Sequence, residues 1–510
     1  MTKEKRLYTA SLVLSLLYAF EFFVTGIFIF ANMFYTWAGL PFVLSAAALL
    51  PFPFSIINIK IFKRQSVSVA VICAAVLMAV GHFLFAAYVL SKLTFLLITG
   101  IPVFAVIAIV GAFLLMALGY PKFSKLGKKI TAVSMSVAIF FVCVFGILKL
   151  GFFRYTSDGV VFAVEDEYQI AWSTSVKSAG YVTVGGKTYY DESNGQNRIS
   201  TLHKVSVPIA ELDRAGGYSL HSTPVYSEAA YLSVSGKEHV KDYKFRAPDT
   251  SNGLQIYNIS DNHECLSGAG NAGKFFGEEL DVLILNGDVI NDVSSLWQIS
   301  LIYKLASRIT GGERAVIFTR GNHECNGKYA DELHEYVGSS EGRFYYEVKL
   351  GGAYFLVLDT NNDMSDDNWL INPAANFELT RKEQTEWLSS LDNFGTDCEY
   401  KLILAHMAFP LSDYERFPEW TEALNRLTTV GKFDVCLSGH SHKLDFAEAG
   451  AETKTDYPVV RGSLRSNNRT EGEGVSPSAF TGTAIECVDG KITVKFTNSK
   501  GQTLAEYAVN

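Results

Sequence analysis

Five short segments in the C-terminal half combine carboxylate, imidazole and amide side chains at spacings that favour metal chemistry. They are Asp261-Asn262-His263, Gly287-Asp288, Gly321-Asn322-His323-Glu324, His406 and Gly439-His440-Ser441-His442. A centre that holds two divalent cations needs ligands of these three types, with one carboxylate shared between the ions. A packed core does not need these residues in this order, so the segments predict a two-metal site.

A mostly apolar run precedes each of these segments. The runs are residues 256–259, 282–285, 316–318, 402–404 and 435–437. Short apolar runs of this length predict buried strands, and in α/β proteins the chemistry lies where such strands end. The strand ends are therefore expected to position the metal ligands.

The order of the five segments resembles the calcineurin-like metallophosphoesterase superfamily, over roughly residues 251–445. The resemblance implies a metal-dependent phosphoric ester hydrolase with an α/β layered sandwich fold. For the first of two metal ions it implies the ligands Asp261, His263, Asp288 and His442. For the second it implies Asp288, Asn322, His406 and His440, so that Asp288 bridges the ions. His323 matches the family's catalytic histidine.

The chemistry expected of such a site is hydrolysis of a phosphate ester. Two cations would bind phosphate oxygens and lower the pKa of a bridging water, while His323 would protonate the leaving oxygen or stabilise the charge that develops there. Glu324 and Asp359 are candidates to orient an imidazole or carboxamide ligand. An equally good interpretation makes both of them ordinary loop carboxylates.

A β-rich region before these segments resembles the layout of purple acid phosphatases, in which a fibronectin III-like module precedes the catalytic domain. Those enzymes supply a metal-binding tyrosine three residues after the aspartate of the second segment, where this chain has Asn291. A tyrosinate–iron(III) centre is therefore not expected, and Mn²⁺, Fe²⁺ or Zn²⁺ fits the ligand set better. The histidines outside the motifs in this part of the chain are expected at the surface: His203, His221, His239 and His334.

The first third of the 510-residue chain is strongly apolar. It contains five stretches, at about 8–33, 39–59, 67–90, 94–118 and 130–150. Each has about 20 residues or more, enough for a helix to cross a membrane. Basic residues cluster before the first stretch and in alternate connections, which predicts a cytoplasmic N-terminus and an extracytoplasmic catalytic domain in a multi-pass protein of the cell membrane. Glu21 and His82 would lie at similar depth and pair, as a polar clamp or as part of a lipid or signal site.

Three domains are predicted from these patterns. Residues 1–153 would form a helical membrane domain, and residues 154–247 a fibronectin III-like β-sandwich with Trp172 in its core. Residues 248–510 would form the metallophosphoesterase domain. Cys265 and Cys325 each follow a site histidine by two positions, and they could be free thiols or a cross-link.

The function predicted is that of a membrane-anchored dinuclear-metal phosphoesterase acting on phosphomonoesters or phosphodiesters outside the cytoplasm. Lipid- or cell-wall-linked phosphates are among the candidate substrates, and membrane lipids are expected partners. A formal net charge of −8 and the absence of a basic stripe argue against nucleic acid. The alternatives are a receptor or transport module whose phosphoesterase-fold domain acts as a sensor, and a non-catalytic metal-binding domain.

Overall fold

The computed structural model describes residues 153–227, 234–391, 394–407, 430, 432–450, 455–463 and 479–509. Residues 153–224 and 237–510 form one unit by their contacts, and it contains all five motif segments. Residues 225–236 are grouped with residues 1–152 in a second unit, of which only a short piece lies within the described residues.

The first sheet has four parallel strands at its centre, which run in the order β10, β11, β12 and β1. Their bounds are Leu254–Ile259, Val282–Asn286, Ala315–Thr319 and Val160–Val164. Antiparallel strands β19 (Thr481–Val488), β20 (Lys491–Asn498) and β21 (Thr503–Val509) continue the sheet beyond β10. The central strands are apolar almost throughout because other layers cover both faces of the sheet.

The second sheet is also mixed. Its parallel strands are β14 (Ala353–Leu358), β15 (Tyr400–Ala405), β16 (Val435–Ser438) and β18 (Val459–Arg461). Antiparallel strands β13 (Tyr346–Leu350) and β17 (Asp445–Ala447) form its edges. The two sheets pack face to face, and Ile284 of β11 and Leu404 of β15 belong to the single apolar core between them.

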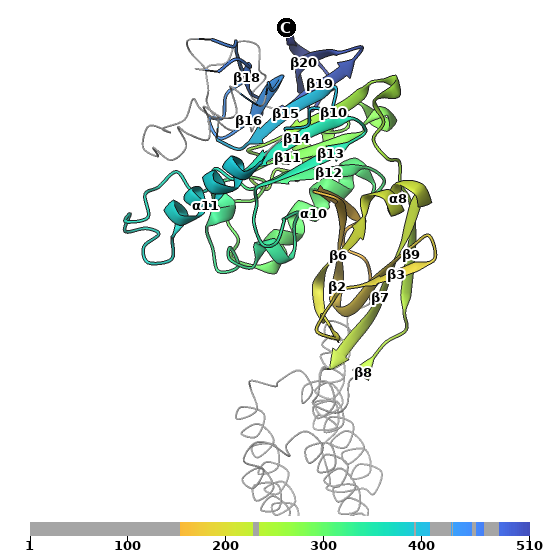
Figure 1. Cartoon of the computed structure of the whole chain (residues 1–510). Helices are drawn as coiled ribbons and strands as arrows, with labels where there is room; N and C mark the ends of the chain where they lie inside the picture. Colours follow the sequence, from red (N-terminus) through yellow and green to blue (C-terminus); the bar gives the residue numbers. More distant parts are fainter. Residues whose placement is uncertain are drawn as a thin grey trace, which may run out of the picture. The chain divides into compact units, whose positions relative to one another are not determined.

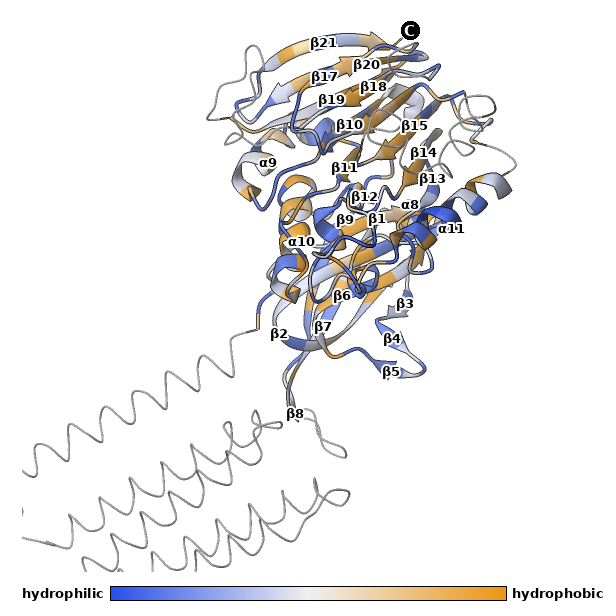
Figure 2. Cartoon of the chain, turned by 90° about the vertical axis from the view of Figure 1, so that its left-hand side faces the viewer, coloured by the Kyte–Doolittle hydropathy of each residue, from blue (hydrophilic) through white to orange (hydrophobic). Residues whose placement is uncertain are grey.

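Helices cover the outer faces of the two sheets (Figure 1). Helices α9 (Leu266–Ala272) and α10 (Leu296–Thr310) pack on the first sheet, and α11 (Phe377–Ser390) packs on the second. Figure 2 shows the contrast in hydropathy between the apolar strands β11 and β14 and the largely hydrophilic α11. The predicted layered α/β sandwich with mixed sheets is confirmed.

The region before β10 joins the first sheet. It contains β2 (Glu167–Val184), β3 (Lys187–Tyr190), β4 (Glu192–Ser193), β5 (Gln196–Asn197), β6 (Ser200–Pro208), α8 (Ile209–Ala215), β7 (Gly217–Ser227), β8 (Val234–Ser235) and β9 (His239–Lys244). Strand β1 lies between β12 and β2, parallel to β12 with Val161 opposite Ala315. Short 3₁₀ turns are Thr250–Asn252, Gly277–Glu279, His323–Cys325 and Leu333–Glu335.

A separate fibronectin III-like sandwich is therefore not supported. Sequence periodicity indicates strands but not their partners, and the partner of β1 is β12 of the first sheet. Phe162 of β1 packs within 6.4 Å of Tyr303 in α10 and within 6.3 Å of Phe318 in β12, measured between ring centroids. Trp172 is fully buried. The predicted domain boundary between residues 247 and 248 stays a prediction.

His203 is fully buried, so its predicted surface position is wrong. Its Nδ1 lies 2.8 Å from an oxygen of Asp191, its Nε2 lies 2.9 Å from Ser178 Oγ, and its ring stacks on Trp172. The order serine, histidine, aspartate is that of a hydrolytic triad, but Ser178 is fully buried and no substrate reaches it. The cluster instead holds β2 against β6.

The predicted localisation needs correction. Among the described residues, the longest helix is α10 with 15 residues, or about 22 Å, which is shorter than the ~30 Å hydrocarbon layer of a bilayer. None of the described helices has the length and apolar character that a membrane crossing requires. The prediction of a multi-pass membrane protein with an extracytoplasmic catalytic domain finds no support in these helices. The five predicted spans, with Glu21 and His82, lie outside the described residues.

The place of β1 in the first sheet can be tested with Phe162→Ala. We expect the free energy of unfolding to fall by about 3–5 kcal/mol, because the fully buried ring fills the layer between β12 and α10. Amide hydrogen exchange should accelerate in β12 as well as in β1. Val240→Ala, at a side chain that is 50% exposed, should change stability by less than about 0.5 kcal/mol. Faster exchange confined to residues 154–247 would contradict the shared sheet.

Candidate metal centre

The site lies where strands of both sheets end. Three motif loops follow the neighbouring strands β10, β11 and β12, and the other two follow β15 and β16 of the facing sheet. Several site residues adopt positive φ, which costs a non-glycine residue about 1–3 kcal/mol and clusters at functional sites. They are Asp261 (52°), His263 (41°), Asp288 (51°), His440 (65°) and His442 (52°).

The first group of side chains consists of Asp261, His263, Asp288 and His442. One ligand atom from each lies within 4.8 Å of the others. The Nε2 atoms of His263 and His442 are 3.2 Å apart, and His442 Nε2 is 3.4 Å from Asp261 Oδ1. Two hydrogen bonds hold the carboxylate of Asp261 in place, since Ser260 Oγ and the backbone N–H of His440 donate to it.

The second group consists of Asp288, His406 and His440, again with ligand atoms within 4.8 Å of one another. His406 Nδ1 donates to the carbonyl of Asn286 at 2.8 Å, which directs Nε2 toward Asp288 Oδ2 at 3.2 Å. That Nε2 is buried and makes no hydrogen bond of good geometry. The side-chain oxygen of Asn322 lies 3.1 Å from His440 Nδ1, so the amide joins this group.

These donors fit divalent cations. Imidazole nitrogens, carboxylate oxygens and an amide oxygen are ligands for Mn²⁺, Fe²⁺ and Zn²⁺. Two imidazole nitrogens held 3.2 Å apart, and a buried nitrogen without a good hydrogen bond, are costly unless a cation or proton lies between such groups. Asp288 belongs to both groups, as a bridging ligand must.

Burial and neighbouring charges give the histidines different pKa values. It lowers the pKa of His263 to about 4, and together with the neighbouring His406 it lowers the pKa of His440, so both are ready as neutral ligands. Burial disfavours the charged form of His406 too, but the Asp288 carboxylate outweighs it and raises the pKa to about 10. Burial opposes ionisation of Asp288, yet His406 and His323 hold its pKa well below the usual value.

His323 differs from the other histidines in its exposure, since 40% of its side chain is accessible. Its Nδ1 donates to the carbonyl of Asn291 at 2.7 Å, and its Nε2 faces Asp288 Oδ2 at 3.9 Å. Its backbone N–H donates to the other oxygen of Asp288 at 3.0 Å. The ring is thus fixed beside the two groups with one nitrogen open to a substrate.

Glu324 is fully buried and is no ordinary loop carboxylate. One oxygen accepts the backbone N–H groups of Asp288 and Gly321, and the other accepts those of Val289 and Ile290, at 2.8 to 3.1 Å. It therefore holds the loops after β11 and β12 together. Burial and the nearby Asp288 raise its pKa to about 7. Glycine is required at Gly321, where a Cβ would lie 2.3 Å from Asp288 Oδ1.

Asp359 is also buried, but it supports the site through Arg320. Its carboxylate pairs with the Arg320 guanidinium and accepts the backbone N–H of Asn361 at 3.0 Å. The guanidinium stacks over the ring of Phe344 at 4.6 Å. Gln384 of α11 binds both backbone groups of Asp359 at 2.9 Å. The sequence analysis missed Arg320, although a charged residue between a strand and a motif is a usable signal.

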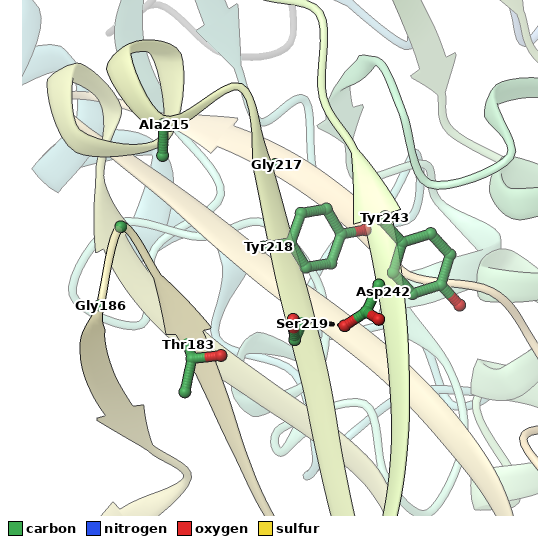
Figure 3. A pocket seen from close by; sticks show the side chains of 9 residues that line it. Thr183, Gly186, Ala215, Gly217, Tyr218, Ser219, Asp242 and Tyr243 are labelled. Carbon is green, nitrogen blue, oxygen red and sulfur yellow. Dashed lines mark hydrogen bonds between the residues drawn. The ribbon is translucent and has the colours of Figure 1, made fainter.

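Cys265 and Cys325 are free thiols in the structure. A hollow of about 410 Å³ lies away from the motifs, on strands β2, β7 and β9 (Figure 3). Its walls include Tyr218, Ser219 and Asp242, and the last two are hydrogen-bonded at 2.6 Å. No motif residue lines it.

Comparison with known proteins places the motif segments in a family. Residues 254–444 match the family described as calcineurin-like phosphoesterase. No curated protein matches the sequence. A purple acid phosphatase from yellow lupin (Lupinus luteus) seeds is 15% identical over 69% of this chain and 73% of its own, with a TM-score of 0.45. PhoD is 11% identical over 70% of this chain and 90% of its own, with a TM-score of 0.41.

The family match covers every motif segment, including the ligands contributed by both sheets. Proteins of this family typically bind two divalent cations. The chain therefore carries a calcineurin-like phosphoesterase domain over residues 254–444, and this supports a metal-dependent phosphoester hydrolase.

Proposed function

We propose that the two groups bind two divalent cations and that the chain hydrolyses phosphate esters between them. The first ion would be held by Asp261, His263, Asp288 and His442, and the second by Asp288, Asn322, His406 and His440. The observation that carries the proposal is the membership of Asp288 in both groups. A single carboxylate reached by ligands from two sheets is the arrangement that a dinuclear centre requires.

When bound, such ions neutralise phosphate charge and activate a water for attack. The protein's own contribution to leaving-group departure would come from His323. Its Nδ1–H is committed to the carbonyl of Asn291, so Nε2 is the nitrogen that can hold a proton for the departing oxygen. Its 40% exposure leaves it within reach of a bound ester.

The ligand set favours Mn²⁺, Fe²⁺ or Zn²⁺, and the substrate class is either a phosphomonoester or a phosphodiester. Turnover of p-nitrophenyl phosphate and of bis-p-nitrophenyl phosphate by the metal-loaded full chain distinguishes the two. Stoichiometric metal without turnover of either ester would favour a non-catalytic binding domain.

Replacing Asp288 by asparagine tests the shared ligand. We expect the bound metal to fall from about two ions per chain to less than one. Since several kcal/mol of charge stabilisation would be lost, hydrolysis should fall by more than about 1000-fold. Metal analysis and steady-state kinetics measure both effects. His334→Gln changes a histidine outside both groups and should leave metal content and rate unchanged; unchanged hydrolysis by Asp288→Asn would refute the proposal.

Metal binding should release a proton from His406. In the metal-free protein its pKa of about 10 keeps the ring protonated at pH 7 to 8, and only the neutral ring can bind a cation. Calorimetric titration with Mn²⁺ in buffers of different ionisation enthalpy should therefore show about one proton released at these pH values, and fewer above pH 10. The His406→Gln variant should lose this release, and equal proton release by both proteins would contradict the assignment.

Because Glu324 holds the loops after β11 and β12 together, Glu324→Gln is expected to weaken metal binding. The amide presents one oxygen where the carboxylate presents two, so at least two of the four backbone N–H groups lose their acceptor. Metal affinity should weaken about 10- to 100-fold, as for other supporting contacts around metal ligands. Isothermal titration below the unfolding temperature measures it. Glu332→Gln, at an exposed side chain, serves as a matched control. Equal metal affinities of the two variants would argue against this role of Glu324.

A further inference from the structure

Asn326 uses all four of its polar groups to connect the loops around the proposed site. Its backbone carbonyl accepts the N–H of Val293 at 2.7 Å, and its own N–H donates to the carbonyl of His323 at 3.2 Å. Its side-chain Nδ2 donates to the carbonyl of Asn322 at 2.8 Å. Its Oδ1 accepts from Nδ2 of Asn362 at 3.2 Å.

These four bonds lead to three parts of the site, and the bonds to Asn322 and His323 lie within the loop after β12. Val293 belongs to the loop after β11, which also carries Asp288 and the Asn291 carbonyl that fixes His323. Asn362 belongs to the segment after β14, close to Asp359 and its ion pair with Arg320. Asn326 therefore joins three loops that approach His323 from different strands.

The orientation of the side-chain amides of Asn326 and Asn362 is fixed by the contact between Asn362 and Met364. The backbone N–H of Met364 donates to Oδ1 of Asn362 at 2.9 Å, which leaves Nδ2 of Asn362 as the donor to Asn326. Oδ1 of Asn326 is then the acceptor, and its Nδ2 must face the carbonyl of Asn322. Asn362 is fully buried, so a reversed amide there would leave polar groups unpaired at a cost of about 1–3 kcal/mol.

We propose that Asn326 is a positioning residue that sets the place of His323 relative to Asp288. The inference rests on the proposed phosphoester hydrolysis. Asn326 holds the carbonyls of Asn322 and of His323 itself, so it fixes the two peptide units from which the catalytic side chain projects. Displacement of a reacting group by about 1 Å can cost 100-fold in rate, and these two peptides control such a displacement.

The test is Asn326→Asp in the full chain. The change keeps the shape of the side chain, and Asn362 can still donate to it, but an oxygen now faces the carbonyl of Asn322 and repels it. We expect kcat to fall about 10- to 100-fold for a phenyl ester of the class that the wild type cleaves. The fall should be smaller for the p-nitrophenyl ester, whose leaving group needs no proton. KM and metal content should stay within about twofold of the wild type.

Two further variants and one control test this interpretation. His323→Ala should show the same dependence on the leaving group, because both changes remove proton donation. Asn362→Asp replaces the outer donor of the chain by an oxygen that faces Oδ1 of Asn326, farther from His323, and should give a smaller effect in the same direction. Asn197→Asp on the exposed strand β5 makes the same chemical change far from the site and should leave kcat unchanged.

The possible outcomes separate this inference from the proposed function. If the wild type shows no metal-dependent turnover, the proposed function itself fails. If the wild type is active and Asn326→Asp keeps its kcat and leaving-group dependence, the positioning role is overturned. A uniform fall for all esters that excess Mn²⁺ reverses would overturn it as well, because the effect would then lie in metal binding. Should Asn326→Asp not fold, Asn362→Asp alone decides between these results.

Discussion

The rest of the site depends on the negative charge of two buried carboxyl groups, those of Asp288 and Glu324. Glu324, in the loop after β12, accepts the backbone N–H of Asp288 in the loop after β11, and both acidic side chains are buried away from water. Burial and the charge of Asp288 raise the pKa of Glu324 to about 7. A buried charge pair of the same sign is costly unless positive charge lies close by. In the metal-free protein that charge is the protonated ring of His406, and bound divalent cations would take its place.

This concentration of charge is possible because of the way the two sheets meet. The ends of β10, β11 and β12 face the ends of β15 and β16, so short loops reach one point from two directions. Several of these loops hold positive φ values, and the apolar core between the sheets keeps them in place. Strain at a site persists only where the surrounding structure fixes it, and here the surrounding strands are almost fully buried.

The strands before β10 contribute to the same architecture. Strand β1 pairs with the start of β12, at Ala315 and Val316, and covers an edge that would otherwise present unpaired backbone groups. Behind the site, Arg320 and Asn326 flank this loop on both sides, and both are held by the segment after β14. His323 is thus supported by both sheets.

The sequence by itself determined the residue types of the site, the strands that precede them and the layered α/β class, because motif order and short apolar runs are local properties. Tertiary structure decided what depends on contacts between distant segments. It paired β1 with β12 in place of a separate sandwich, buried His203 with Asp191 and Ser178, and gave Glu324 four backbone donors. Such pairings join residues far apart in the chain, and a side chain's neighbours across a sheet leave no periodic trace in the sequence.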